Sequence, residues 1–270
     1  MYILTMLSGK KIAAVIPAYN EAKNIAKVIQ GLPDFVDAII VVDDASEDAT
    51  FAAASAFERE GLKVLRHEKN SGAGAAIITG YLEAAESNAD IAVVLAGDNQ
   101  MKVCEIERVV TPVATGGADY SKGNRLCSKE IGWMPASRRF GNYALTYLTR
   151  LATGDFTIMD SQCGFTAIDL GFFSRLDHNG IYPRYGYPNS MLAALIEAGA
   201  RIAEVEVSPV YENGKSGIRW YIAAFTYPCI LLDIFLKRAA RRIRSMLTSK
   251  ALEKARSTAG AALLTVKKPS

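Results

Sequence analysis

The sequence has few of the residues that build metal clusters or disulfide frameworks. Its 270 residues include only four cysteines and two histidines. The cysteines are far apart and form no Cys-x-x-Cys pair; they are Cys104, Cys127, Cys163 and Cys229. The histidines, His67 and His178, are just as dispersed. This pattern argues against a zinc site and a disulfide scaffold, and favours single thiols in a reducing compartment.

The sequence also lacks a long, uninterrupted apolar run. The strongest candidate covers residues 220–236, where 17 residues include Pro228 and Asp233. As a helix it would span ~25 Å, which is short of the ~30 Å hydrocarbon core of a bilayer. Trp220, Tyr221 and Tyr227 lie in its first half, and five Lys/Arg follow between 237 and 244. We expect an amphipathic helix in the membrane interface, with a soluble packing or dimer helix as the alternative. The N-terminal stretch lacks a basic region and a cleavage site, so no secretion signal is predicted.

The near-neutral net charge is an average of two unlike parts. The chain has 31 Lys/Arg and 28 Asp/Glu. Residues 237–270 contain ten of the bases and one acid, or +9, which leaves −6 on residues 1–236. A basic tail behind an acidic body favours an anionic membrane surface as partner. No upstream segment offers base-reading or stacking chemistry, so a nucleic-acid partner is not expected.

The first hundred residues alternate between strand and helix patterns. Short apolar runs predict buried strands at 12–16 (ending at Pro17), 38–42, 62–65 and 91–95. Helical spacing between them predicts a helix capped by Asn20, a helix over 50–60 capped by Asp48 and ended by Gly61, and a helix over 75–85. Strands that are apolar on both faces and alternate with helices indicate an α/β fold. We expect a mostly parallel sheet with helices on both faces.

Polar clusters follow the predicted strands, at the sheet edge where such folds bind ligands. They occupy 17–21, 43–46, 70–74 and 97–100. Carboxylates there suit a nucleotide sugar, because they accept hydrogen bonds from base and ribose and hold a Mg²⁺ or Mn²⁺ ion on the diphosphate. The alternative is that they cap the following helices.

The glycine-rich turn at 70–74 resembles a dinucleotide-binding loop only in part. The third glycine is replaced by Ile77, and the turn follows the third strand, so a Rossmann cofactor is not expected. We expect its glycines to let the backbone approach a diphosphate.

Several segments in this order resemble glycosyltransferase family 2. They are PAYNEAKNI, IIVVDDASEDAT, NSGAGAAIITG and VVLAGDNQM. Later segments resemble more particularly the polyprenyl-phosphate sugar transferases of the dolichol-phosphate-mannose type: SKGNRL, LTRLATGDFTIMDSQCGFTAID and RYGYPNSMLAALIEAGARIAEVEV. The resemblance covers about residues 10–220. It implies a GT-A fold and inverting transfer of a hexose from a GDP- or UDP-linked donor to a polyprenyl phosphate.

The resemblance also implies roles for individual residues. The donor nucleotide would be bound by Pro17, Tyr19, Glu21, Asp43, Asp44 and Gly72. A divalent cation, Mg²⁺ or Mn²⁺, would be held by Asp98 and Gln100. The acceptor phosphate would be held by Arg125, Arg138, Arg139 and Lys215. The catalytic group would comprise Asp98, Arg125 and Gln162.

Two departures from the family pattern are informative. The usual Asp-x-Asp metal motif has Ala96 in its first position, so weaker metal binding is expected. Hydroxyl-acceptor relatives place an acidic base near the segment that here reads YPNS, which has no carboxylate. A phosphate acceptor is already an anion and needs positive charge instead of a base, so these features favour a polyprenyl phosphate.

Two alternatives stay open on the sequence. Asp160 could serve as the base for a hydroxyl acceptor, and the chain could be a non-catalytic nucleotide-sugar-binding relative. Cys163 is expected to be a packed thiol, because direct inverting displacement needs no covalent intermediate. The expected organisation is a GT-A catalytic domain over 1–218, interfacial helices over 219–256 and a flexible tail over 257–270. The chain would attach peripherally to the cytoplasmic face of the membrane. The sequence does not specify which sugar or nucleobase the donor carries, or whether the chain forms a homo-oligomer.

Overall fold

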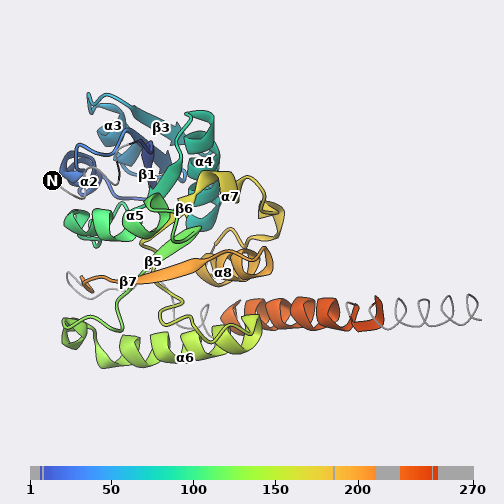
Figure 1. The fold of residues 1–270 in the computed structure, drawn as a ribbon. Coiled ribbons are helices and arrows are strands. Elements are labelled where there is room, and N and C mark those ends of the chain that lie inside the picture. Colours follow the sequence, from blue (N-terminus) through green and yellow to red (C-terminus); the bar gives the residue numbers. More distant parts are fainter. Residues whose placement is uncertain (1–6, 8, 185, 211–225, 245, 249–270) are drawn as a thin grey trace, which may run out of the picture.

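A computed structural model describes residues 7, 9–184, 186–210, 226–244 and 246–248. Seven strands of this part form one mixed sheet in the order β3-β2-β1-β4-β6-β5-β7, with helices on both faces (Figure 1). The strands are β1 Ile12–Ala18, β2 Ala38–Asp43, β3 Leu62–Arg66, β4 Ile91–Val94, β5 Tyr120–Asn124, β6 Thr166–Asp169 and β7 Ile202–Glu206. The α-helices are α2 Ile25–Gly31, α3 Thr50–Ser55, α4 Ala73–Glu86, α5 Ile106–Ala114, α6 Ala136–Thr153, α7 Leu170–Phe173 and α8 Tyr187–Glu197. Short 3-10 helices are η1 Val103–Glu105, η2 Ile131–Trp133 and η3 His178–Gly180.

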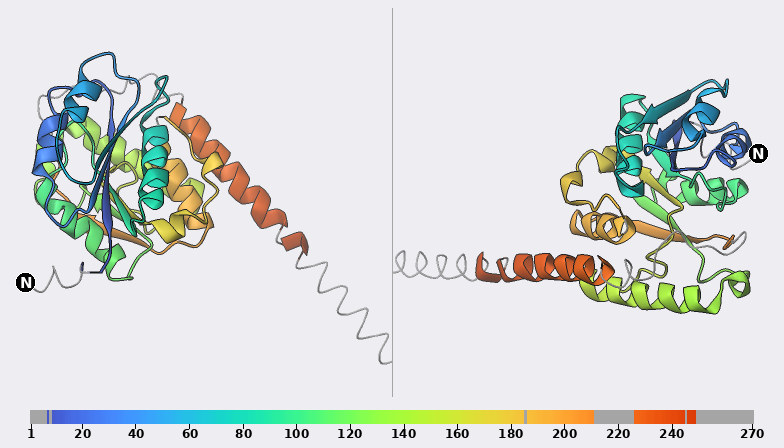
Figure 2. Two further views of the ribbon diagram at one scale, coloured as in Figure 1. Left: turned by 90° about the horizontal axis from the view of Figure 1, so that it is seen from above. Right: turned by 180° about the vertical axis from the view of Figure 1, so that it is seen from behind.

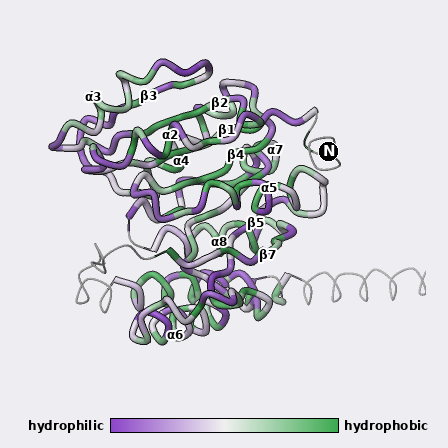
Figure 3. Tube along the Cα trace, turned by 90° about the vertical axis from the view of Figure 1, so that its left-hand side faces the viewer, coloured by the Kyte–Doolittle hydropathy of each residue, from purple (hydrophilic) through white to green (hydrophobic). Residues whose placement is uncertain are grey.

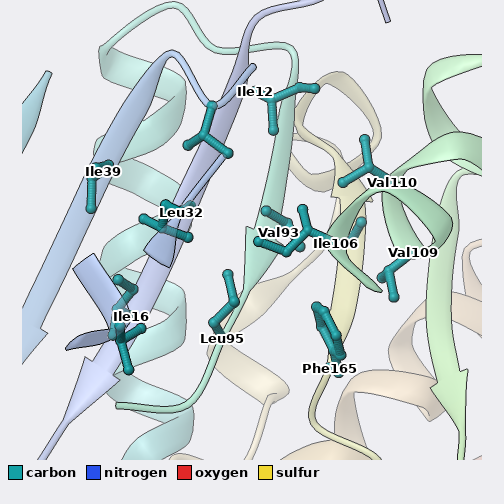
Figure 4. Packing of buried hydrophobic residues seen from close by; sticks show 14 of the residues in the cluster. Ile12, Ile16, Leu32, Ile39, Val93, Leu95, Ile106, Val109, Val110 and Phe165 are labelled. Carbon is teal, nitrogen blue, oxygen red and sulfur yellow. The ribbon is translucent and has the colours of Figure 1, made fainter. Parts of the chain in front are cut away.

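The central strands are apolar on both faces because a layer of helices covers each face. Alternate residues of β1 enter different cores: Ile16 packs with α2 and α5, whereas Val15 packs with α4 and α8. Figure 4 shows the first of these cores, in which side chains of β1, β2, β4 and α5 gather in one apolar layer. The hydropathy colouring of Figure 3 follows the same pattern, with apolar strands inside and polar loops at the strand ends. This is the burial that a parallel α/β sheet predicts.

The strand directions determine which loops meet at one edge. β1, β2, β3 and β4 run parallel, β6 runs antiparallel between β4 and β5, and β5 and β7 are parallel. The carboxyl ends of β1, β2, β4 and β5 therefore share an edge with the amino end of β6. The loops that follow Ala18, Asp43, Val94 and Asn124, and the loop that precedes Thr166, all lie at this edge.

Several predicted element boundaries differ from the structure, and three of the differences have a clear physical reason. β1 continues through Pro17 to Ala18, because a parallel partner still pairs with it at Val42. Asn20 does not cap a helix: it has φ of 58°, its side-chain oxygen accepts the Glu47 N–H at 2.9 Å, and α2 begins later, at Ile25. α3 ends at Ser55, five residues before the predicted end. Asp48 does bond to the start of α3, where its Oδ1 accepts the Thr50 N–H at 2.9 Å.

Two helices lie below the sheet and its helical layers, apart from the central fold (Figures 1 and 2). One is α6; the other covers 226–244 and 246–248 and is called the C-terminal helix here. Ile230, Leu231 and Ile234 of the C-terminal helix pack on Ala152 of α6. Within the described part of the chain, no helix combines the length and the apolar character needed to cross a bilayer. The predicted tail at 257–270 lies outside the described residues.

Candidate active site

A cavity of about 220 Å³ lies at the shared strand edge. The residues that line it come from the ends of β1, β2 and β4 and from the first turns of α4. Five predicted donor or metal residues are among them: Pro17, Tyr19, Glu21, Asp44 and Asp98. Ala73, Ala76, Ala96 and Gly97 supply small walls. Because the carboxyl ends of parallel strands share one edge of the sheet, residues up to 81 positions apart, from Pro17 to Asp98, meet in this cavity. Asp43, Gly72 and Gln100 are not in this lining.

Asp44 holds the glycine-rich turn against the cavity. Its two carboxylate oxygens accept the backbone N–H groups of Ser71 at 2.8 Å and Gly72 at 2.7 Å. The His67 ring lies beside the same carboxylate, with Nδ1 at 2.8 Å from Oδ1, and its Nε2 is 3.0 Å from Thr79 Oγ1. Asp44 thus ties the end of β2 to the start of α4. His67 was not singled out from the sequence for any site; only its place just after a strand signalled it.

Gly72 and Asp43 each make contacts within the chain. Gly72 has φ of 101°, and a Cβ there would lie 2.6 Å from the Pro183 carbonyl oxygen, so the turn packs against protein atoms. The glycine is thus required by a close approach within the chain. Its predicted approach to a diphosphate stays a prediction. Asp43 is fully buried and pairs with Arg66, Nε to Oδ2, at 3.1 Å. Its contact with a base or ribose stays a prediction.

Glu21 and Asp98 bring two carboxyl groups to the lining of the cavity. Burial raises the pKa of Glu21, and the nearby Asp98 charge raises it further, while a hydrogen bond from Asn24 lowers it. Burial also raises the pKa of Asp98, whose Oδ1 accepts the Gln100 N–H at 3.0 Å. These two half-buried carboxylates repel each other, and a bound cation would offset that repulsion.

The same residues fit a divalent cation only if other oxygens complete its shell. Among the described residues, no three His, Cys, Asp or Glu side chains converge on one metal position. Asp98, a carboxylate beside a cavity, suits an ion that takes its remaining ligands from a bound diphosphate and water, as Mg²⁺ usually does. Gln100 is half-buried beside Asp98, and its role as a ligand stays a prediction.

Arg125 and Asp160 form a buried, two-pronged ion pair at the end of β5. Arg125 Nε and Nη2 donate to the two Asp160 carboxylate oxygens at 2.9 and 3.0 Å, and the Arg125 backbone N–H donates at 3.1 Å. Asp160 is fully buried, and the buried Lys122 ammonium donates to its backbone carbonyl. Burial alone would raise the pKa of Asp160, but the charge and hydrogen bonds of Arg125 and the charge of Lys122 lower it to about 2.

This pairing bears on Asp160 as a candidate base. A carboxylate with a pKa of about 2 is a weak proton acceptor near neutral pH. Both of its oxygens are also occupied by Arg125. Lys122 was missed in the sequence, although a lysine within an otherwise buried strand is a signal of an internal ion pair.

Acidification is expected to remove the stabilisation that Asp160 provides. Its pKa falls from an ordinary 3.8 to about 2 on folding. A carboxyl group whose pKa is lower in the folded state stabilises that state fully above the unfolded pKa, about pH 4. This contribution to the free energy of unfolding, about 2 kcal/mol, is lost as the pH falls toward about 2. Urea unfolding of the wild type and of Asp160→Asn at pH 5 and pH 2.5 checks this. The difference in unfolding free energy between the two proteins should shrink at the lower pH, and an unchanged difference would contradict the assignment.

Gln162 sits beside this ion pair and contacts α8. Its Nε2 donates to Asn189 Oδ1 at 3.1 Å and to Ser161 Oγ at 2.9 Å. Asn189 is fully buried and donates in turn to Thr149 of α6 at 2.6 Å. Gln162 thus links the loop before β6 to α6 and α8. Neither Gln162 nor Arg125 lines the 220 Å³ cavity, but both lie at the same sheet edge.

Two further predicted phosphate ligands, Arg138 and Arg139, do not line the cavity. Arg138 and Arg139 lie in the first turn of α6 and are half-buried, and neither is among the cavity-lining residues. Lys215 lies outside the described residues. Cys163 is buried, and burial raises its pKa, which keeps it a thiol and disfavours a nucleophilic role.

Comparisons with known proteins agree with this geometry. Residues 13–176 match the glycosyl transferase family 2. A UDP-N-acetylglucosamine–dolichyl-phosphate N-acetylglucosaminyltransferase of Methanococcus voltae is 32% identical over 221 residues, covering 76% of this chain and 88% of that protein. A dolichol-phosphate mannosyltransferase of Pyrococcus furiosus is 29% identical over 126 residues, or 43% of this chain and 35% of that protein.

A solved structure shares the fold at lower identity. Glucosyl-3-phosphoglycerate synthase from Mycobacterium tuberculosis, in complex with Mn²⁺, uridine diphosphate and glucosyl-3-phosphoglycerate, superposes with a TM-score of 0.66. The two are 21% identical, and the match covers 86% of this chain and 82% of that one. The sheet of this chain is the GT-A sheet that the sequence resemblance implied. With the match over 13–176 and the relative at 32% identity, the chain belongs to glycosyltransferase family 2 and is a glycosyltransferase.

Proposed function

We propose that the chain transfers a sugar from a nucleoside-diphosphate sugar to a polyprenyl phosphate, with inversion at the anomeric carbon. The observation that carries the acceptor class is the Arg125–Asp160 pair. It engages the carboxylate that would otherwise be the candidate base and gives it a pKa of about 2. An acceptor that must lose a proton is poorly served here, whereas a phosphate oxygen is already ionised. The dolichyl-phosphate relatives support the same class.

The donor is proposed to occupy the cavity between the ends of β1, β2 and β4. Tyr19 and Pro17 would bound the nucleoside, and Asp98 would lie at the diphosphate. A divalent cation bound between Asp98 and the diphosphate would offset negative charge on the leaving group. The Mn²⁺ in the complex of the mycobacterial synthase supports a divalent ion in this fold, and Mg²⁺ and Mn²⁺ are both proposed here.

The proposed step needs no proton transfer to a side chain. An oxygen of the acceptor phosphate attacks the anomeric carbon on the face opposite the leaving group. The bond between that carbon and the donor phosphate oxygen breaks, and its electron pair leaves with the nucleoside diphosphate. Within this chain, Arg125 would hold Asp160 in its ionised form, the neighbouring Lys122 would add positive charge to this group, and Gln162 would position groups through Asn189. Arg138, Arg139 and Lys215 are proposed to contact the acceptor phosphate.

The chain is also proposed to consist of a catalytic domain over 1–218 followed by membrane-interfacial helices over 219–256. These helices would attach it peripherally to the cytoplasmic face of an anionic membrane. The C-terminal helix supports this, because it exposes large apolar side chains beside a cluster of bases. The apolar residues are Leu232, Phe235, Leu236, Ile243, Met246 and Leu247. The bases are Lys237, Arg238, Arg241, Arg242 and Arg244. Each base near an anionic surface contributes about 1 kcal/mol to attachment.

A radiolabel assay tests the proposed reaction. The purified full chain is incubated with Mg²⁺ or Mn²⁺, polyprenyl phosphate and a labelled donor, using UDP-N-acetylglucosamine, UDP-glucose and GDP-mannose in turn. Label is expected in a lipid-linked product with polyprenyl phosphate and not with the matched polyprenol. Transfer to the polyprenol or to a sugar hydroxyl would overturn the acceptor class. Donor binding by calorimetry without transfer to any acceptor would favour a non-catalytic relative.

A further inference from the structure

Two loops meet beside the cavity at the shared strand edge. The first loop follows β1 over residues 19–24 and places Tyr19 and Glu21 in the cavity lining. The second loop follows β2 over residues 44–50 and contributes Asp44 to the lining. Ser46 and Thr50 of the second loop do not line the cavity. Their side chains contact the first loop instead.

Three successive backbone N–H groups of the first loop donate to side-chain oxygens of the second loop. The pairs are Asn20 with Ser46 Oγ at 2.9 Å, Glu21 with Thr50 Oγ1 at 2.7 Å, and Ala22 with Asp48 Oδ2 at 3.2 Å. In return, the side-chain oxygen of Asn20 accepts a backbone N–H of the second loop at 2.9 Å. Asn20 has φ of 58°, a conformation that a residue with a side chain keeps only where its surroundings fix it. Contacts within the chain therefore determine the path of the first loop.

The second loop is itself anchored beneath these contacts. The Ser46 N–H donates to Asp43 Oδ1 at 3.3 Å, and Arg66 Nη2 donates to the Ser46 carbonyl at 2.9 Å. The Thr50 hydroxyl donates to Asp48 Oδ1 while it accepts from the first loop. Ser46 is 3% exposed and Thr50 is fully buried. Water cannot readily replace these hydroxyls, so removing one leaves a backbone N–H without its partner.

We propose that Ser46 and Thr50 are positioning residues for the nucleoside part of the donor. They hold the backbone of the first loop, and thereby keep the side chains of Tyr19 and Glu21 in place on the cavity lining. A lining that is already fixed does not have to be ordered when the donor binds, and this preserves affinity. The inference rests on the proposed function, because it takes the cavity as the donor site.

A pair of substitutions at Thr50 tests the hydroxyl directly. Thr50→Val removes it and nearly keeps the shape of the side chain, whereas Thr50→Ser retains it. Calorimetry on the purified full chain, with UDP and GDP in turn and Mg²⁺, should show a Kd about tenfold higher for Thr50→Val. The Kd of Thr50→Ser should stay within about twofold of the wild type, because the hydrogen bond is retained.

Kinetics separates positioning from a role in the reaction step. The nucleoside takes no part in breaking the bond to the anomeric carbon, so the contact acts equally on the bound donor and on the transition state. Thr50→Val should therefore raise the KM for the nucleotide sugar about tenfold and leave kcat within about twofold. Ser46→Ala removes the neighbouring bond and should raise the Kd at least threefold. It also provides the measurement if Thr50→Val does not fold.

Thr153 offers a matched control in α6. It is also buried, its Oγ1 accepts the Asp155 N–H at 3.3 Å, and it donates to the Thr149 carbonyl at 2.8 Å. Thr153→Val removes a comparable hydroxyl away from the cavity lining. It should lower the melting temperature as Thr50→Val does, but leave the Kd for UDP and GDP within about twofold.

Three outcomes would overturn the inference. The first is a wild type that binds UDP or GDP while Thr50→Val and Ser46→Ala bind equally well. The second is a Kd raised as much by Thr50→Ser or Thr153→Val as by Thr50→Val, because the hydroxyl at this place would then not be the cause. The third is a wild type that binds neither nucleotide, which would overturn the proposed function as well. Nucleotide binding without sugar transfer would overturn the proposed function alone, since the Kd series decides the inference by itself.

Discussion

Asp98→Asn is expected to reduce sugar transfer by about 10²–10³-fold, comparable to losing one electrostatic contact to developing charge. The side chain lines the donor cavity beside Glu21, and it is the proposed protein ligand of the cation. The fold should be unaffected or slightly more stable, because burial raises the pKa of Asp98 and so disfavours its charged form.

Steady-state kinetics with each donor and thermal unfolding check this prediction together. The control is Glu47→Gln, which neutralises an exposed acid in the loop after β2 and should leave kcat/KM within about twofold. Excess Mn²⁺ should restore little activity to Asp98→Asn, because the substitution removes a negative charge beside the leaving group in addition to lowering the affinity for the cation. Activity within threefold of the wild type, or a loss that follows a lowered melting temperature, would remove Asp98 from the site.

Arg125→Met is expected to lower the free energy of unfolding by about 3–5 kcal/mol, because it leaves the Asp160 carboxylate buried without its partner. Asp160 is fully buried, so water cannot take the place of the guanidinium. The double variant Arg125→Met with Asp160→Asn should recover at least half of the loss, because the uncompensated charge is then gone. Denaturant unfolding at neutral pH measures all three proteins.

The chain provides a matched control on its surface. Arg201 and Asp119 also form a two-pronged pair, at 3.0 and 2.7 Å, but Arg201 is 59% exposed. Arg201→Met should therefore change the free energy of unfolding by less than about 1 kcal/mol. If Arg125→Met cost no more than Arg201→Met, burial of the pair would not be the source of its stability, and its effect on the pKa of Asp160 would be in doubt.

The parallel half of the fold could be predicted because its signals are local. The runs around Val15, Ile40 and Val93 are apolar on both sides, and such strands need helices on both faces. The cavity residues could be predicted for the same reason, since Glu21, Asp44 and Asp98 each follow a strand. Boundaries were less predictable, because Pro17 stays in its strand through pairing with Val42, a contact distant in sequence.

The functions of single side chains within the site depend on partners that periodicity does not reveal. Asp44 binds a turn 27 residues later, and Asp160 binds Arg125 from 35 residues away. The orientation of α6 was also invisible: its sequence alternates apolar and polar groups like any surface helix. Only the packing of Thr146 and Thr149 shows which side faces the body.

The packing of the turn before α4 has an evolutionary consequence. A side chain at Gly72 or Gly74 would meet the carbonyl oxygens of Pro183 or Tyr182 at 2.6 and 2.8 Å, and one at Gly80 would meet Val15. These glycines are fixed by contacts inside the chain, whichever sugar is bound. Among diverging relatives that use different donors, the NSGAGAAIITG segment should therefore stay nearly constant, while substitutions accumulate at cavity positions such as Tyr19 and Ala96. This segment identifies members of the family, but it gives little information about which sugar each member transfers.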